Sequence, residues 1–277
     1  MSTVNEKLTA IADAIRDKTK TTAPLSLDDM ATGIQNISTG DNYYDTFWEA
    51  YQDVSSTGKS QITSATYMFG GRSWKDTTFK PKYSMYSITN ANQMFAQCGV
   101  TDMAGRMKEL GLVFDYAKVT GAFTQMYAYC LCTTIPEINS IGGSGFTQTF
   151  QQATKLQTIE KIILKADGSQ SFSNTFAACE SLVNLTFAGA NETDENNPTG
   201  FIGQNGLDLS PAKKLSKASI INVIKHLSST ASGKTVTFSL AAVNNAFETS
   251  EGAADGSASD EWRTLKATKS NWTVSLV

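Results

Sequence analysis

The hydrophobic pattern of this chain repeats itself between Ile62 and Ala190. Each repeat is anchored by an aromatic residue, and successive anchors lie 26, 32, 23 and 26 residues apart. A self-similar unit of this length is typical of solenoids, in which stacked copies bury one continuous core. The anchors are Phe69, Phe95, Tyr127, Phe150 and Phe176.

Other positions keep a fixed offset from the anchor. A small or aromatic residue stands four places before it, and a small residue three places after it, except in the first repeat. Positions i, i+4 and i+7 share one face of a helix, so we predict a short helix in each repeat. These positions are Ala65, Ala91, Phe123, Phe146 and Phe172 before the anchor, and Arg72, Cys98, Cys130, Ala153 and Cys179 after it.

Spaced aliphatic residues follow each predicted helix, most clearly in 156–162 and 182–187, and their alternation suits a short strand. A helix–turn–strand unit of about 25 residues cannot bury its apolar face alone. We therefore predict an α/β fold, a leucine-rich-repeat-like solenoid with a parallel sheet on one face and the helices on the other. The longest interval predicts a loop insertion between Val100 and Gly121.

The cysteines and the single histidine do not predict a metal or redox site. Three of the four cysteines share one repeat position, so stacking should form them into a buried column and hold them apart. Cys130 and Cys132 are too close for a C-x-x-C motif. His226 lies off the apolar stripe of its predicted helix, so we expect it to be exposed and inert. No cofactor is predicted.

The first 40 residues contain two amphipathic segments, each with a narrow apolar seam. Such a seam is the pattern by which helices pair, and it predicts an attachment or oligomerisation module over residues 1–40. A local helical hairpin remains the alternative. The seam residues are Val4, Leu8, Ile11, Ile15, Leu27, Met30, Ile34 and Ile37.

Two further regions are expected to close the ends of the solenoid at residues 61–190. Residues 41–60 carry an aromatic stripe at helical spacing, predicted to be a capping helix and linker. Residues 191–206 read as a polar loop. Residues 207–277 are predicted to form a β/α cap that continues the parallel sheet and shields its open end, with helices starting after Ser216 and Ser259.

Composition narrows the classes of function. The net charge is −3, the pI is about 5.3 and the basic residues are scattered, which argues against binding to nucleic acid or anionic membranes. No apolar run is long enough to insert into a membrane. The polar N-terminus lacks the apolar core of a signal peptide, so we expect synthesis in the cytoplasm without an export signal.

The repeat residues 94–98 (MFAQC) and 176–182 (FAACESL) resemble BspA-like leucine-rich repeats. The whole chain is similar to tail-associated or other virion structural proteins of phages and prophages of gut Firmicutes. The segments that carry this second resemblance are 8–16, 25–30, 79–83 and 272–276. The resemblance implies attachment to the virion through the N-terminus and an outward-facing solenoid.

We therefore expect a non-enzymatic virion protein, such as a tail fibre, baseplate or head fibre protein, that binds a host-cell glycan or protein. Its other expected partners are virion proteins at the N-terminus and two further copies of itself in a homotrimer. A BspA-like bacterial adhesin and a glycan-processing enzyme remain the alternatives. Weak candidates for ligand binding are the aromatic residues Trp74, Tyr83 and Tyr86, whose rings suit stacking on sugars.

The predicted assembly module can be tested by light scattering on the full chain and on a version that lacks residues 1–40. We expect the full chain to be an oligomer and the truncated chain to be a folded monomer, because the apolar seams pair between chains. Two monomers would show instead that the seams serve a local hairpin or a virion partner.

Overall fold

The chain divides into two compact units, residues 1–52 and 53–277. In the first unit Thr9, Ala12 and Asp13 are helical, whereas the predicted seam residues and the aromatic stripe lie outside the described residues. The computed structural model describes residues 9, 12–13, 63–70, 88–109, 114, 116–192, 201–204, 206–248 and 259–277.

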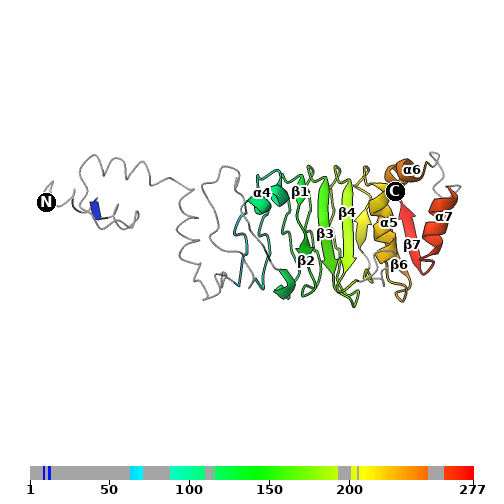
Figure 1. Ribbon diagram of the computed structural model, residues 1–277, viewed down its shortest axis with the longest axis horizontal. Coiled ribbons are helices and arrows are strands. Elements are labelled where there is room, and N and C mark those ends of the chain that lie inside the picture. Colours follow the sequence, from blue (N-terminus) through cyan, green and yellow to red (C-terminus); the bar gives the residue numbers. More distant parts are fainter. Residues whose placement is uncertain are drawn as a thin grey trace. The chain divides into compact units, whose positions relative to one another are not determined.

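The second unit is a parallel-sheet β-solenoid, as the spaced aliphatic residues predicted (Figure 1). Two short strands pair with one edge of β3, and β4 pairs with the other edge, all in parallel. The strands are β1 (Thr134–Ile135), β2 (Ile138–Asn139), β3 (Thr158–Leu164) and β4 (Asn184–Gly189).

The register of the sheet places aliphatic residues of successive repeats beside each other. Ile159 is paired with Ile135 on one side and with Leu185 on the other. Ile162 is paired in the same way with Ile138 and Phe187, and the side chains of both rows are buried. Each added repeat thus extends the same rows of buried side chains.

Each repeat has an arc of tight turns where a short helix was predicted, and that prediction is wrong. In the second repeat alternate N–H groups donate to the carbonyl three residues earlier, as Met94 does to Ala91 (3.2 Å). The N–H groups between them donate to the next repeat, as Phe95 does to Met126 (2.8 Å). We call these arcs the turn segments: residues 65–70, 91–98, 123–130, 146–153 and 172–179.

The sequence pattern does not separate a helix from such an arc, because both turn the same positions inward. Ala91, Phe95 and Cys98 are all buried, as one face of a helix would be. The difference lies in the backbone: Gln93 and Gln97 have left-handed φ angles of 52° and 60°. A helix keeps its N–H groups for its own carbonyls, whereas the arc leaves alternate ones free to bind the neighbouring repeat.

The five anchor rings form one continuous stack through the core. Neighbouring ring centroids are 5.1, 5.0, 5.9 and 5.5 Å apart, and neighbouring planes are tilted by 9 to 19°. A second stack joins Phe123, Phe146 and Phe172, at 5.5 and 5.4 Å. Each such pair adds about 0.5–1.5 kcal/mol beyond the burial of its area.

The second stack is absent from the first two repeats, where Ala65 and Ala91 take its place. The ring of Phe114 lies there instead, and it meets the anchor rings of these two repeats edge-on at 6.2 and 5.8 Å. Tyr116 is buried beside Phe114, with ring centroids 6.1 Å apart. Two alanines in the repeat are thus matched by two large rings from elsewhere in the chain.

These rings come from the insertion between Val100 and Gly121, which was predicted to be a loop. The insertion contains α4 (Met103–Glu109), with both of its methionines buried, and a 3-10 helix (Tyr116–Lys118). It therefore contributes to the core as well as to the surface.

The cysteines that share a repeat position are buried, as predicted. Cys98, Cys130 and Cys179 form no disulfide bond, and the Cys179 thiol donates to the carbonyl of Phe150 (3.1 Å). Burial raises the pKa of Cys179 to about 12, so this thiol stays protonated at neutral pH. Among the described residues, His, Cys, Asp and Glu form no group of three or more suited to a metal ion.

The four-stranded sheet ends at β4, and the helix α5 (Lys217–His226) covers the edge of that strand. Ser219 Oγ accepts a hydrogen bond from the N–H of Leu185 (2.8 Å). Asn222 Oδ1 accepts one from the N–H of Phe187 (2.7 Å), and its Nδ2 donates to the carbonyl of the same residue (3.0 Å). Helix side chains thus take the place of the next strand.

The C-terminal section forms a second parallel sheet and does not continue the first, contrary to the prediction. The predicted helix caps are confirmed: Ser216 Oγ accepts a hydrogen bond from Ser219 N, and Ser259 Oγ accepts one from Trp262 N, both at 3.3 Å. The new elements are β5 (Leu207–Leu209), β6 (Lys234–Phe238), β7 (Trp272–Leu276), α6 (Leu240–Phe247) and α7 (Asp260–Ala267).

No helix in the described part of the chain is both long and apolar enough to cross a membrane.

The anchor stack can be tested at Phe150, whose ring is fully buried between those of Tyr127 and Phe176. We expect Phe150→Ala to lower the free energy of unfolding by about 3–5 kcal/mol, because it removes two ring contacts and leaves a cavity. The exposed Thr154→Ala should change it by less than about 0.5 kcal/mol. Urea unfolding curves of equal midpoint for the two variants would contradict a stack that carries stability.

Candidate binding surface

The outer side of the five turn segments, here called the turn face, contains no charged residue. This holds for every position of residues 65–70, 91–98, 123–130, 146–153 and 172–179, in a chain of which 18% is charged. The first segment is shorter than the others, because its position three places after the anchor is Arg72, which lies outside the described residues. The outward positions carry threonine, serine, asparagine, glutamine, alanine and tyrosine instead. A polar but uncharged surface that extends over five repeats is the most unusual surface feature of the described residues.

A column of glutamine side chains runs along the turn face. Gln93 Nε2 donates to Gln125 Oε1 (2.7 Å), and Gln125 Nε2 donates to Gln148 Oε1 (3.4 Å). All three are half-buried and stand two places before the anchor of their repeat. Stacked amides that hydrogen-bond in register hold each other in a single orientation.

The backbone of these glutamines is left-handed, with φ of 52° at Gln93 and Gln125 and 55° at Gln148. This conformation costs a residue with a side chain roughly 1–2 kcal/mol, so the rest of the arc must hold it in place. The second left-handed position of each segment includes Gln97, Tyr129 and Gln152, all exposed. Left-handed turns therefore bring the larger polar side chains to the surface in aligned columns.

Two tyrosines stand on the turn face with about half of their surface open to solvent. Tyr67 and Tyr129 are each 46% exposed. The ring of Tyr67 lies against the backbone of Gly70, since a Cβ built on that glycine would come within 2.5 Å of its Cδ2 atom. Glycine at position 70 thus leaves room for the ring, and about half of the side chain stays open to solvent.

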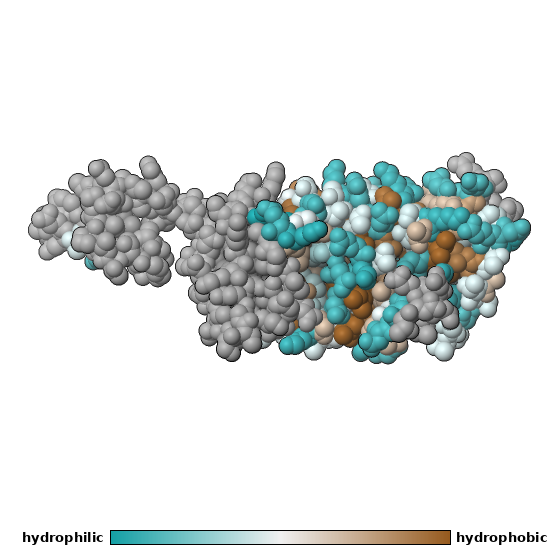
Figure 2. Space-filling model, viewed as in Figure 1, coloured by the Kyte–Doolittle hydropathy of each residue, from teal (hydrophilic) through white to brown (hydrophobic). Residues whose placement is uncertain are grey.

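The strand side of the solenoid has a different character. It carries the ion pair Lys161–Glu137 (3.2 Å) and the exposed residue Glu160 of β3. Figure 2 shows hydrophilic atoms over much of the strands, with smaller hydrophobic patches between them. The mixed charges here are typical of an ordinary solvated surface.

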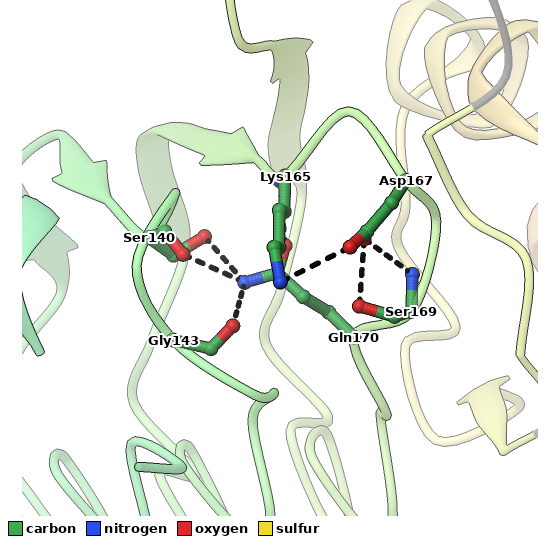
Figure 3. Close-up of polar contacts among 6 residues, drawn as sticks. All are labelled: Ser140, Gly143, Lys165, Asp167, Ser169 and Gln170. Carbon is green, nitrogen blue, oxygen red and sulfur yellow. Dashed lines mark hydrogen bonds and ion pairs between the residues drawn. The ribbon is translucent and has the colours of Figure 1, made fainter. Parts of the chain in front are cut away.

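A polar cluster at one corner of the solenoid is centred on the buried side chain of Gln170 (Figure 3). Gln170 Nε2 donates to the carbonyls of Ser140 (2.7 Å) and Gly143 (3.1 Å), and Oε1 accepts from the N–H of Lys165 (2.8 Å). Both ends of the amide are satisfied by backbone groups of neighbouring corners. The cluster therefore fastens one repeat to the next and leaves no group free for a ligand.

Asp167 lies on the solvent side of the same corner (Figure 3). Its Oδ1 accepts hydrogen bonds from the hydroxyl (2.6 Å) and the N–H (2.9 Å) of Ser169, and its Oδ2 lies 3.0 Å from Lys165 Nζ. These contacts, the Ser169 hydroxyl first among them, lower the pKa of Asp167 to about 2. A serine and a lysine at a turn account for this shift without a ligand.

His226 was predicted to be exposed, and that prediction is wrong, since the side chain is only 2% exposed. Its Nδ1 donates to the carbonyl of Asn222 (2.7 Å), and its Nε2 lies 3.2 Å from Glu192 Oε2. That oxygen also accepts from the N–H of Gly189 (2.7 Å). A carbonyl oxygen can only accept, so Nδ1 must carry a proton. The hydrogen bond between Nε2 and Oε2 then needs one further proton, which lies on one of these two atoms.

This buried pair joins α5 to the residues that follow β4. Both ring nitrogens of His226 are engaged, so neither is available as a general base. The sequence could not indicate the pairing, because Glu192 lies 34 residues before His226. The prediction of exposure rested on the apolar stripe of the helix alone, and a buried histidine with a carboxylate partner falls outside that pattern.

The predicted binding and assembly residues cannot be placed. Trp74, Tyr83 and Tyr86 lie outside the described residues, as do all eight seam residues of the N-terminal segments. The turn face is therefore a surface that the sequence reasoning missed. Its signals were present: no charge in four complete aligned segments or in residues 65–70 of the first, and glutamine at one repeat position in three of them.

The chain matches no family model, no curated protein and no solved structure. Its function must therefore be inferred from its own residues.

The corner at Asp167 predicts a pH dependence. A carboxylate with a lowered pKa stabilises the fold above its ordinary pKa of 3.8, and this contribution is lost as the pH falls towards about 2. Asp167→Asn should lower the free energy of unfolding at pH 7 by less than about 1 kcal/mol, because the group is exposed to solvent. Urea titrations between pH 7 and about 2 should show the two proteins converge on acidification, and a constant difference would contradict this role.

Proposed function

We propose that this chain is a non-enzymatic structural protein of a phage particle that presents the turn face to a receptor on the host cell. The observation that carries the proposal is the uncharged, regular surface over five turn segments. A surface that serves only solubility is normally charged, as the strand side is. Patterned polar groups held in fixed orientations are suited to recognition.

The N-terminal segments have the separate role of attachment in this proposal. The seam residues Val4, Leu8, Ile11 and Ile15, with those of the second segment, pair with further copies of the chain or with another virion protein. A tail fibre, baseplate or head fibre position would suit a homotrimer whose solenoids point outward. The resemblance of residues 8–16 and 25–30 to phage structural proteins supports this arrangement.

We further propose that the solenoid is a variant of the leucine-rich-repeat type. Leu156 and Leu182 are buried at equivalent positions between turn segment and strand, as a repeat of this type requires. The turn segment replaces the helix on the opposite side. This replacement gives a flatter outer surface than a row of helices, because every repeat presents backbone turns at the same level.

The proposed function can be tested on particles from the phage or lysogen that encodes the chain. We expect the chain to copurify with the particles through a density gradient, at a copy number that is a multiple of three. Purified full-length chain, added first, should lower the rate at which the particles adsorb to host cells. Recovery of the chain from the cell envelope instead of the particles would favour the BspA-like adhesin and overturn the proposal.

A further inference from the structure

The glutamine column leaves a fixed set of hydrogen-bonding groups on the turn face. A carboxamide has two N–H donors and an oxygen with two lone pairs. Gln125 uses one donor on Gln148 and one lone pair on Gln93. One donor and one lone pair of this half-buried side chain therefore remain for solvent or a ligand, in an orientation set by its neighbours.

Glutamine amides recur in three successive repeats, at the spacing of the stacked rings beneath them, 5.0 to 5.9 Å. A ligand that meets them must repeat as well, and must offer both donors and acceptors. Hydroxyl groups do both, so a chain of sugar units is suited to the column. An apolar ligand would leave the amides unpaired.

The absence of charge restricts the ligand further. An anionic polymer would lose hydration on this surface and find no lysine or arginine in the turn segments to compensate it. A cationic one would likewise find no carboxylate. The surface therefore favours an uncharged ligand.

Tyr67 and Tyr129 add apolar area at two places on the same face. The ring of Tyr67 packs close to Gly70 and is about half exposed, so it offers apolar area for stacking against the C–H face of a sugar. It stands in the same column as the glutamines, one repeat before Gln93. A polymer laid along the column would meet this ring at its end.

From these observations we propose that the turn face binds an uncharged polysaccharide of the host envelope that lies along the solenoid axis. Gln93, Gln125 and Gln148 provide the hydrogen bonds, and Tyr67 and Tyr129 provide the stacking surfaces. This inference rests on the proposed function, since it names the chemical class of the receptor for the same face.

The test uses fluorescently labelled full-length chain and intact host cells. One sample of cells is treated with periodate, which cleaves vicinal diols of sugars, and another with proteinase K. We expect periodate to abolish binding and the proteinase to leave it unchanged. Binding should also persist from low salt to about 0.5 M NaCl, because no ion pairs are involved.

Three variants locate the site. Gln125→Glu keeps the shape of the side chain but adds a charge and removes its donors, so affinity should fall at least about tenfold. Gly70→Ala should weaken binding by lifting the Tyr67 ring, and the fold accepts it, since Ala96 and Ala128 occupy the equivalent position. Gln157→Glu, the same change at an exposed residue outside the turn segments and directly before β3, should bind as the parent does.

The outcomes separate this inference from the proposed function. Loss of binding with proteinase but not with periodate would overturn the polysaccharide and keep a protein receptor. Equal affinities of Gln125→Glu, Gly70→Ala and the parent would overturn the turn face as the site. Chain that binds no host cells, with or without treatment, would overturn receptor binding itself. Circular dichroism spectra establish that each variant is folded, and Gly70→Ala keeps the test decisive if Gln125→Glu does not fold.

Discussion

Alternate backbone N–H groups of the first four turn segments have their acceptor in the next repeat, and the stacking of these repeats depends on this bond. Phe95 donates to Met126, and Tyr127 to Thr149, both at 2.8 Å, deep in the core. An N–H group left there without an acceptor would cost as much as a lost buried hydrogen bond. A single repeat is therefore unstable alone, and its neighbours are needed before its own turns can be held.

The same hydrogen bonds fix the alignment of each turn segment with the next. This alignment explains why equivalent side chains form columns along the solenoid. Because each turn segment is aligned with the next residue by residue, equivalent side chains must stack: rings on rings inside, amides on amides outside. The ring of Phe150 meets those of Tyr127 and Phe176 for the same reason that Gln125 meets Gln93. The ring stack in the core and the amide column on the surface depend on the same alignment of repeats, so a shift of one repeat against the next would disrupt both.

Much of the fold could be predicted from spacing alone. The five anchors, the parallel strands β3 and β4 (predicted within 156–162 and 182–187) and the caps at Ser216 and Ser259 follow from periodicity and capping chemistry. The turn segments could not be predicted, because their inward positions repeat as those of a helix do and only the left-handed Gln93 and Gln97 distinguish them. Long-range contacts could not be predicted either, as the packing of the Phe114 ring on Phe95 and the pair His226–Glu192 illustrate.

The candidate surface shows the opposite situation, since its signal lay in the sequence but only the fold gives it meaning. Uncharged residues in five separate segments form no pattern until stacking places them on one side. Single exposed tyrosines such as Tyr67 and Tyr129 are ordinary on protein surfaces. Their position beside an amide column is what makes them informative.

Helix α5 covers the last strand of the sheet in a way that allows the number of repeats to change in evolution. Ser219 and Asn222 bind only the edge of β4, so the repeats before β4 lie outside their contacts. A duplicated repeat inserted upstream would find the same backbone partners on both sides and leave this terminator intact. The length of the molecule can thus evolve in whole repeats, while the covered edge prevents the strands of separate molecules from joining into open-ended aggregates.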